Sequence, residues 1–218
     1  MVLEARRRVL ISAVGVLLVL VAAGASAAPA GTPDAMAQMK SLGDAILGLA
    51  RDPACKNDAE SCRTRLRAII EQHWDTTEMA RSALGVHWRD LSAPQQQQFT
   101  QLFAQLTEGI YLSRSNFAKA QRYADQIKVT YLAEIPQGSG YSQINTSVLL
   151  HADDNPISVD YRLRLDRGTW KVYDVIVANI SLVGNYRNQF NRIINSRGYD
   201  SLVKALQQKV QQLQQQST

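Results

Sequence analysis

Cysteine and histidine are both scarce in this chain, which limits the metal and catalytic sites that it could carry. The 218 residues include 2 Cys and 3 His. His73, His87 and His151 stand apart, with no cysteine or carboxylate motif beside them that would suit a shared metal ion. The sequence also lacks G-x-S-x-G, H-E-x-x-H and a glycine-rich phosphate loop. We therefore expect no metal, no cofactor and no catalytic residues, and interpret the histidines as ordinary surface or capping residues.

A long apolar run is missing as well, and the one short run lies at the start of the chain. Arg6, Arg7 and Arg8 are followed by the uncharged residues 9–23 and then by the small residues Ala25-Ser26-Ala27. This order is typical of a secretory signal peptide. The run is short for a membrane span of about 20 residues, so cleavage after Ala27 is favoured over the alternative of an uncleaved anchor. We expect residues 1–27 to be a signal peptide and the rest to be exported.

No block of lysine and arginine stands out, although the chain is basic overall. Its formal charge is +5, and residues 1–27 contribute +2 of this through Arg6, Arg7, Arg8 and Glu4, which leaves +3. A charge this weak, spread over about 190 residues, is not the basic footprint that nucleic-acid binding requires. We therefore expect no nucleic-acid partner. The length predicts one domain, residues 28–210, followed by a frayed glutamine-rich tail at residues 211–218.

The two cysteines, Cys55 and Cys62, are close together in the sequence. In an oxidising compartment such a pair suggests a disulfide, with two free thiols as the alternative. Seven residues along one continuous helix would separate the Cα atoms by about 10 Å, which is too far for a disulfide. The chain must therefore turn between them, near Pro53 and Asn57-Asp58. We expect the disulfide to join two helices.

Apolar residues spaced three and four apart predict the helices of the first half. One covers residues 34–49, and another carries an apolar face over residues 66–74. The sequence Asp75-Thr-Thr-Glu78 is typical of a capping box that begins a short helix ending at Gly85. A second cap at Ser92, with proline and glutamine soon after it, begins a helix that continues to Ile110.

From residue 127 the apolar period changes to two, which predicts consecutive strands. They lie at residues 127–135, 144–150, 157–165 and 170–182. The first places Ile135 on the same face as Val129 and Tyr131, and the last is apolar at both parities, as in a strand covered on both faces. Helical spacing returns over residues 183–194 and 200–210. Helices, then strands, then helices predict an α+β fold, with helices packed on a four-stranded antiparallel curved sheet.

Asp174 interrupts the last predicted strand, and a buried carboxylate needs a partner. We expect an ion pair or hydrogen bond with an arginine. The candidates are Arg162, Arg164 and Arg187. The alternative is an enzyme in which Asp174 and a tyrosine, either Tyr161 or Tyr173, transfer a proton on an apolar substrate. We favour the ion pair, and therefore a protein that is not an enzyme.

Apolar residues are abundant on both the predicted sheet and the helices that cover it. Such a fold can enclose a deep apolar cleft. It can equally close on itself as a filled core, which periodicity alone favours. The pattern therefore leaves open whether the protein binds a ligand in its interior.

Two segments resemble the MlaC family, which is also called the toluene-tolerance family. One is GTWKVYDVIVANISLVGNYRNQF at residues 168–190, and the other is WRDLSAPQQQQF at residues 88–99, followed by Phe103 and Tyr111. The resemblance extends over residues 34–210. Where the family usually has a Glu-Gly or similar pair, this chain has Ala178-Asn179. Asparagine is second to glycine at positive φ, so we expect the local turn to persist.

The resemblance implies a periplasmic carrier that holds phospholipid in a cleft between sheet and helices, in a fold akin to nuclear transport factor domains. It implies two partners, an outer-membrane lipoprotein complex and an inner-membrane ABC transporter complex, and a role in outer-membrane lipid asymmetry. A hopanoid is the alternative ligand, because a related branch accompanies hopanoid biosynthesis. A periplasmic interaction module with a filled core is the alternative function. The expected lipid-binding residues are Val129, Tyr131, Val148, Leu150, Val159, Tyr161, Leu163, Val175 and Val177 from the sheet, and Phe103, Leu106, Ile110, Tyr186 and Phe190 from helices.

Overall fold

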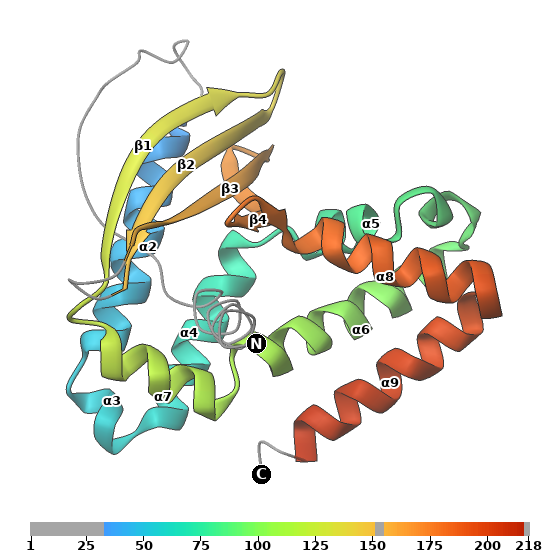
Figure 1. Ribbon diagram of the computed structural model, residues 1–218, viewed down its shortest axis with the longest axis horizontal. Coiled ribbons are helices and arrows are strands. Elements are labelled where there is room, and N and C mark those ends of the chain that lie inside the picture. Colours follow the sequence, from blue (N-terminus) through green and yellow to red (C-terminus); the bar gives the residue numbers. More distant parts are fainter. Residues whose placement is uncertain (1–32, 151–154, 216–218) are drawn as a thin grey trace.

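The computed structural model describes residues 33–150 and 155–215 (Figure 1). The expected signal peptide and His151 lie outside these residues. The helices are α2 (Ala35–Arg51), α3 (Ala54–Asn57), α4 (Ala59–His73), α5 (Thr76–Leu84), the 3-10 helix η1 (Gly85–Asp90), α6 (Ala93–Tyr111), α7 (Arg114–Tyr123), α8 (Leu182–Arg197) and α9 (Tyr199–Gln215). The strands are β1 (Lys128–Pro136), β2 (Tyr141–Leu149), β3 (Ile157–Asp166), β4 (Thr169–Val177) and β5 (Ile180–Ser181). The α+β class is confirmed. No helix among the described residues is both long and apolar enough to span a membrane.

Side-chain caps determine where most helices begin. Asp34, Asp58 and Asp75 each accept a hydrogen bond from the backbone N–H three residues later, at 2.9 to 3.0 Å. Ser92 and Gln95 form the expected capping box at the start of α6. Gly85 ends α5 with φ of 59°, a conformation that glycine adopts without strain. The predicted boundaries of α5 and α6 are confirmed.

The sheet is antiparallel and ordered β1-β2-β3-β4-β5, so among the described residues it has five strands where four were expected. The fourth predicted strand was too long. Ala178 and Asn179 both have positive φ, 49° and 65°, and turn the chain back at Val177. The expected turn at this position is therefore present, and it creates the short strand β5, which pairs with the end of β4.

A β-bulge changes the faces of β1. Tyr131 pairs with Thr146 and Ala133 with Asn145, which leaves Leu132 as the extra residue, 63% exposed. After the bulge every side chain points to the opposite face from the one that strict alternation predicts. Ile135 is consequently 40% exposed, and the prediction that it shares the buried face of Val129 and Tyr131 is wrong.

A second bulge explains why β4 is apolar at both parities. Arg162 pairs with Asp174 and Leu163 with Val172, so Tyr173 is the extra residue. The parity shift places Val172, before the bulge, and Val175, after it, in the same buried cluster. Tyr173 itself packs against the other cluster, which is formed by α5, α6, α8 and α9.

The buried side chains form two separate clusters. The helices and strands that carry them form two groups, which can be seen in Figure 1. The sheet core joins α2, α3, α4 and α7 to the inner face of the sheet. The helical core joins α5, α6, α8 and α9. Within the described residues the chain passes from one core to the other at three places, which are Trp74 to Thr76, Leu112 to Ser113, and Val177 to Leu182.

Two helices depart from the sequence expectations. Helix α7 was not predicted, because its sequence is largely polar and the apolar residues known to be buried from it are Phe117 and Ala120. Helix α9 continues to Gln215, where a frayed tail was expected from residue 211. The Leu213 side chain lies 3.0 Å from the position that a Cβ on Gly109 would occupy. This close approach of α9 to α6 gives the last turns of the helix a packing partner.

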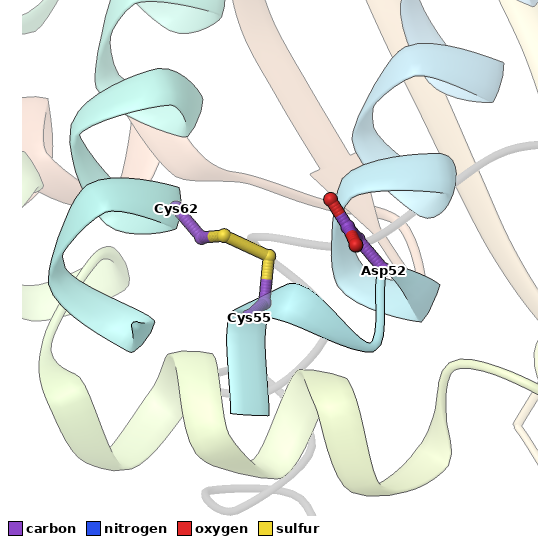
Figure 2. A group of neighbouring side chains, drawn as sticks. All are labelled: Asp52, Cys55 and Cys62. Atoms are coloured by element: carbon purple, nitrogen blue, oxygen red, sulfur yellow. A yellow bond between two sulfur atoms is a disulfide. The ribbon is translucent and has the colours of Figure 1, made fainter. Parts of the chain in front are cut away.

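The expected disulfide is present between α3 and α4 (Figure 2). The Cα atoms of Cys55 and Cys62 are 5.6 Å apart, because the chain turns at Asp58 between the two helices. Asp52 lies beside the sulfur atoms, but its carboxylate accepts a hydrogen bond from the Ala54 N–H and pairs with Arg65 at 3.3 Å. Since the two sulfurs are bonded to each other, neither is a thiolate that could bind zinc. The group is a structural staple.

Replacing both Cys55 and Cys62 with serine should lower the free energy of unfolding by about 2–3 kcal/mol, the value expected for so short a closed loop. Urea denaturation of the oxidised protein and of the double variant measures the difference. Reduced wild-type protein is the matched control and should unfold like the variant. Equal stability of the oxidised and variant proteins would contradict a stabilising role.

Candidate functional site

A cleft of about 190 Å³ lies where the sheet core meets the helical core. Most of its walls are apolar, and the charged side chains are few. The lining residues are Arg67, Ile70, Glu71, Trp74, Thr76, Met79, Phe103, Ala104, Thr107, Glu108, Tyr111, Leu112, Val175, Val177, Ile180, Leu182 and Asn185. All three connections between the cores contribute to this lining. The cleft is therefore formed by the junction of the two cores, and not by the sheet alone.

Helix α6 supplies one wall and extends past both cores. Phe103, Thr107 and Tyr111 recur every four residues and thus lie on one face of the helix, with Ala104 beside them. Helix α4 contributes Ile70 from its last turn, and Trp74, its C-cap residue, also lines the cleft. These helices are linked across the cleft by an ion pair, described below. The side chain of Ala104 is smaller than those of the other α6 residues that line the cleft.

The helical core holds the α6 wall in place through aromatic packing. The Phe103 ring is fully buried and lies 5.2 Å from the Tyr186 ring, edge to face, and 6.0 Å from Phe99, stacked. Phe190 completes the group, 5.7 Å from Phe99. Such pairs stabilise by about 0.5–1.5 kcal/mol beyond the area that they bury. Phe103 thus belongs both to the core and to the cleft wall.

Tyr111, which lines the cleft, and Tyr186, in the helical core, add no charge to this region. The Tyr111 and Tyr186 side chains are near enough for each to affect the pKa of the other. Burial raises the pKa of Tyr111 strongly and that of Tyr186 as well, although for Tyr186 the interaction with Tyr111 opposes the shift. Both phenols are therefore neutral at physiological pH. Since Tyr111 carries no charge, the part of the cleft that it lines stays suited to apolar ligands.

The charged side chains of the lining come from the two helices α4 and α6. Arg67 Nε donates to Glu108 Oε1 at 2.6 Å, and both side chains are about one-third exposed, 32% and 39%. Glu71, one helical turn after Arg67, is exposed and has no ion-pair partner among the described residues. Solvent exposure keeps this pair weak, of the order of 0.2–1 kcal/mol. The cleft thus combines an apolar interior with a polar, solvent-exposed rim.

The turn between β4 and β5 borders the cleft on the other side. Val177 and Ile180, which flank the turn, both line the cleft, and Ile180 is 48% exposed. Ala178 has φ of 49°, a left-handed conformation that is unfavourable for a residue with a Cβ. Its neighbour Asn179, at φ of 65°, is better suited. Backbone strain is therefore located at the edge of the cleft.

Replacing Ala178 with glycine should raise the free energy of unfolding by about 0.5–1 kcal/mol, because glycine relieves the left-handed strain and the added freedom of the unfolded chain offsets only part of the gain. Thermal unfolding of the two proteins measures the effect. Asn179→Gly is the control and should change stability less, since asparagine already tolerates this conformation. A destabilised Ala178→Gly variant would show that the strain is absent.

Asp174 is not part of the cleft lining. It is 2% exposed and forms the expected ion pair with Arg162, at 3.4 Å. It also accepts hydrogen bonds from the Ser181 hydroxyl at 2.6 Å and from the Val183 N–H at 3.1 Å. Ser181 in turn accepts from the Gly184 N–H, so the two residues together cap helix α8. The prediction of an ion pair with an arginine is confirmed, and these contacts give Asp174 a structural role.

The tyrosines of the enzymatic alternative are not arranged around Asp174 for proton transfer. Tyr161 belongs to the sheet core, and successive residues of a strand point to opposite faces, so it lies on the face away from Arg162 and Asp174. Burial raises the pKa of Tyr161 and of Tyr173. Neither tyrosine lines the cleft. The geometry of the described residues therefore favours ligand binding over catalysis by this group.

His73 lies at the end of α4, beside the lining residue Trp74. Its Nδ1 atom is buried without a hydrogen-bond partner among the described residues. Burial, and secondarily the charge of Lys171, lower the pKa of His73. A folded pKa below the unfolded value of about 6.5 means that the unfolded chain binds the proton more readily. The contribution of His73 to the free energy of unfolding is therefore fully present above about pH 6.5 and is lost as the pH falls below that value.

The stability of the wild-type protein should consequently fall more steeply between about pH 7.5 and pH 5 than that of a His73→Gln variant, which has no imidazole to protonate. Urea midpoints at the two pH values measure the slopes. Lys171→Met removes the secondary cause and should reduce the slope only in part. Identical slopes in wild type and His73→Gln would contradict the assignment.

The expected lipid-binding residues divide between the cleft and the two cores. Phe103, Val175 and Val177 line the cleft. The sheet core contains Val129, Tyr131, Val148, Leu150, Val159, Tyr161 and Leu163, and the helical core contains Leu106, Ile110, Tyr186 and Phe190. The sequence analysis did not anticipate the lining residues Ile70, Trp74, Thr107 and Leu182. Ile70 and Trp74 were recognised as an apolar helix face, but the sequence did not indicate what that face borders.

Comparison with known proteins places the chain in a family. The model of the family "MlaC protein" matches residues 40–208. The intermembrane phospholipid transport system binding protein MlaC of Haemophilus influenzae is 24% identical over 160 residues, which cover 72% of each chain. A phospholipid-binding protein of Ralstonia solanacearum, solved in complex with a phospholipid, is 25% identical with a TM-score of 0.69, and the match covers 83% of this chain and 99% of that one. This chain therefore belongs to the MlaC family.

Proposed function

We propose that this protein binds a phospholipid by its acyl chains in the cleft between the two cores and carries it through the periplasm. The observation that supports the proposal is an apolar cleft bounded at its exposed edge by charged side chains. Apolar walls suit acyl chains, and a solvated rim suits a polar headgroup. The two relatives named above are a phospholipid transport binding protein and a phospholipid-binding protein, which agrees with this assignment.

A carrier of this kind has a clear physical purpose. Moving each CH₂ group from an apolar surrounding into water costs about 0.8 kcal/mol, so two acyl chains with some thirty carbons face a barrier of more than roughly 20 kcal/mol. A protein cleft that replaces the bilayer removes most of that barrier. The headgroup gains nothing from burial, since a buried phosphate would need paired cations. We expect it to stay at the solvent-exposed rim.

We further propose that the protein receives and delivers its lipid at two membrane complexes, an outer-membrane lipoprotein complex and an inner-membrane ABC transporter complex, and so contributes to outer-membrane lipid asymmetry. Membership of the MlaC family supports this assignment. The basic, apolar and small-residue segments at the start of the chain support export to the periplasm.

Native mass spectrometry of the purified protein, followed by organic extraction and lipid identification, tests the proposal. A diacyl phospholipid in stoichiometric amount would support it. A copurified hopanoid would replace phospholipid as the ligand and leave the role of carrier in place. A bare protein that also takes no lipid from vesicles would overturn the proposal and favour a periplasmic interaction module.

A further inference from the structure

The rim of the cleft carries both signs of charge within a short distance along two helices. Arg67 and Glu71 are one turn apart on α4, and Glu108 on α6 pairs with Arg67. All three line the same cleft. The rim therefore offers one guanidinium and two carboxylates where a bound lipid would leave the apolar interior.

The guanidinium is only partly used within the protein. Its one ion pair among the described residues runs from Nε to a single oxygen of Glu108, and no other hydrogen bond engages its terminal nitrogens in that part of the chain. Those nitrogens are the donors that match the oxygens of a phosphate in a two-point contact. Arg67 can thus bind a phosphate without first breaking its pair with Glu108.

The carboxylates have acceptor capacity left over as well. Glu71 is exposed without an ion-pair partner among the described residues, and one Arg67 pair cannot balance two negative charges. A primary ammonium, with three donors, would satisfy both carboxylates. An anionic headgroup without an ammonium would leave them uncompensated beside its own phosphate.

We propose that Arg67, Glu71 and Glu108 form a headgroup subsite that selects zwitterionic phospholipids with a primary ammonium group over anionic ones. Arg67 contacts the phosphate, and the two glutamates contact the ammonium. The inference rests on the proposed lipid-binding function and adds the class of headgroup to it. Because the rim is solvated, the selection is modest and depends on salt, on the order of three- to fivefold at low ionic strength.

The test offers the lipid-depleted full protein vesicles of equimolar phosphatidylethanolamine and phosphatidylglycerol, then reisolates it and measures both lipids. Phosphatidylethanolamine should exceed phosphatidylglycerol by about three- to fivefold in wild type, and the ratio should approach one in Glu71→Gln combined with Glu108→Gln. Arg67→Gln should lower uptake of both lipids. Asp125→Asn is the matched control, since this acid is 89% exposed, lies outside the cleft, and should leave the ratio unchanged.

The outcomes separate the two proposals. Stoichiometric uptake of both lipids in equal amounts would overturn the headgroup subsite while supporting lipid binding. A preference that persists in the double glutamine variant would also overturn it, since the selection would then come from elsewhere. Uptake of neither lipid by wild type would overturn lipid binding itself. Raising the salt concentration should bring the wild-type ratio toward one, a change that selection by tail shape would not show.

Discussion

An Ala104→Trp variant should lose lipid uptake by roughly tenfold or more, a change of the size that overpacking by about 1–3 kcal/mol produces. Ala104 lies in the α6 wall between larger lining residues and is not fully buried. An indole at this position projects into open space and would occupy much of a cleft of about 190 Å³. Because the ring enters the cleft and not a packed core, the fold should be retained. Lipid transfer from vesicles, with circular dichroism for folding, measures both effects.

The control for this experiment places the same side chain on the same helix. Gln101 lies one turn before Ala104, is exposed and does not line the cleft. Gln101→Trp should therefore take up lipid as wild type does. If Ala104→Trp binds lipid normally while remaining folded, the acyl chains lie elsewhere and the cleft is not the binding site.

A Phe103→Ala variant should lose about 3–5 kcal/mol of unfolding free energy, the usual result of deleting a buried aromatic ring. Phe103 is fully buried and packs against Phe99, Tyr186 and Phe190. Phe99→Ala deletes the same ring from the same helix and cluster and should lose a similar amount. Urea denaturation of lipid-free protein measures both losses.

The two variants should differ once lipid is present. The space left by Phe103 joins the cleft, whereas Phe99 does not line it. Lipid can therefore fill part of the first cavity but not the second, and binding to the folded state raises its stability. We expect loading to raise the unfolding temperature of Phe103→Ala more than that of Phe99→Ala. Equal recovery of the two variants would show that Phe103 is a core residue alone.

Much of the fold follows from local signals in the sequence. The helix starts at Asp75 and Ser92 were predictable because their caps are short motifs with a defined geometry. The strands were predictable from alternation. What alternation does not reveal is a bulge, since one extra residue shifts every later side chain to the other face. That is why Ile135 was misplaced, and why β4 is apolar at both parities on account of the extra residue Tyr173.

The site was less predictable than the fold, for a physical reason. Apolar residues that fill a core and apolar residues that line a cleft share the same periodicity, because both face inward. Phe103 was assigned to the lining, and it belongs both to the helical core and to the cleft wall. Trp74 borders the cleft and both cores, but its place in the sequence did not indicate that it lines a cleft. The difference depends on how two cores meet, which is set by contacts between residues far apart in the sequence. Arg67 and Glu108, 41 positions apart, are paired only in the folded protein.

The division into two cores, with the chain crossing between them beside the cleft, affects how cargo can enter and leave. A small rotation of one core against the other would widen or narrow the space between them while each core stays packed, as in a hinge. The backbone change would fall on the three short connections, and one of them holds the left-handed residues Ala178 and Asn179. The cleft would therefore open for its lipid while the secondary structure stays intact. A partner that binds one core alone would be able to turn it against the other and so open the cleft.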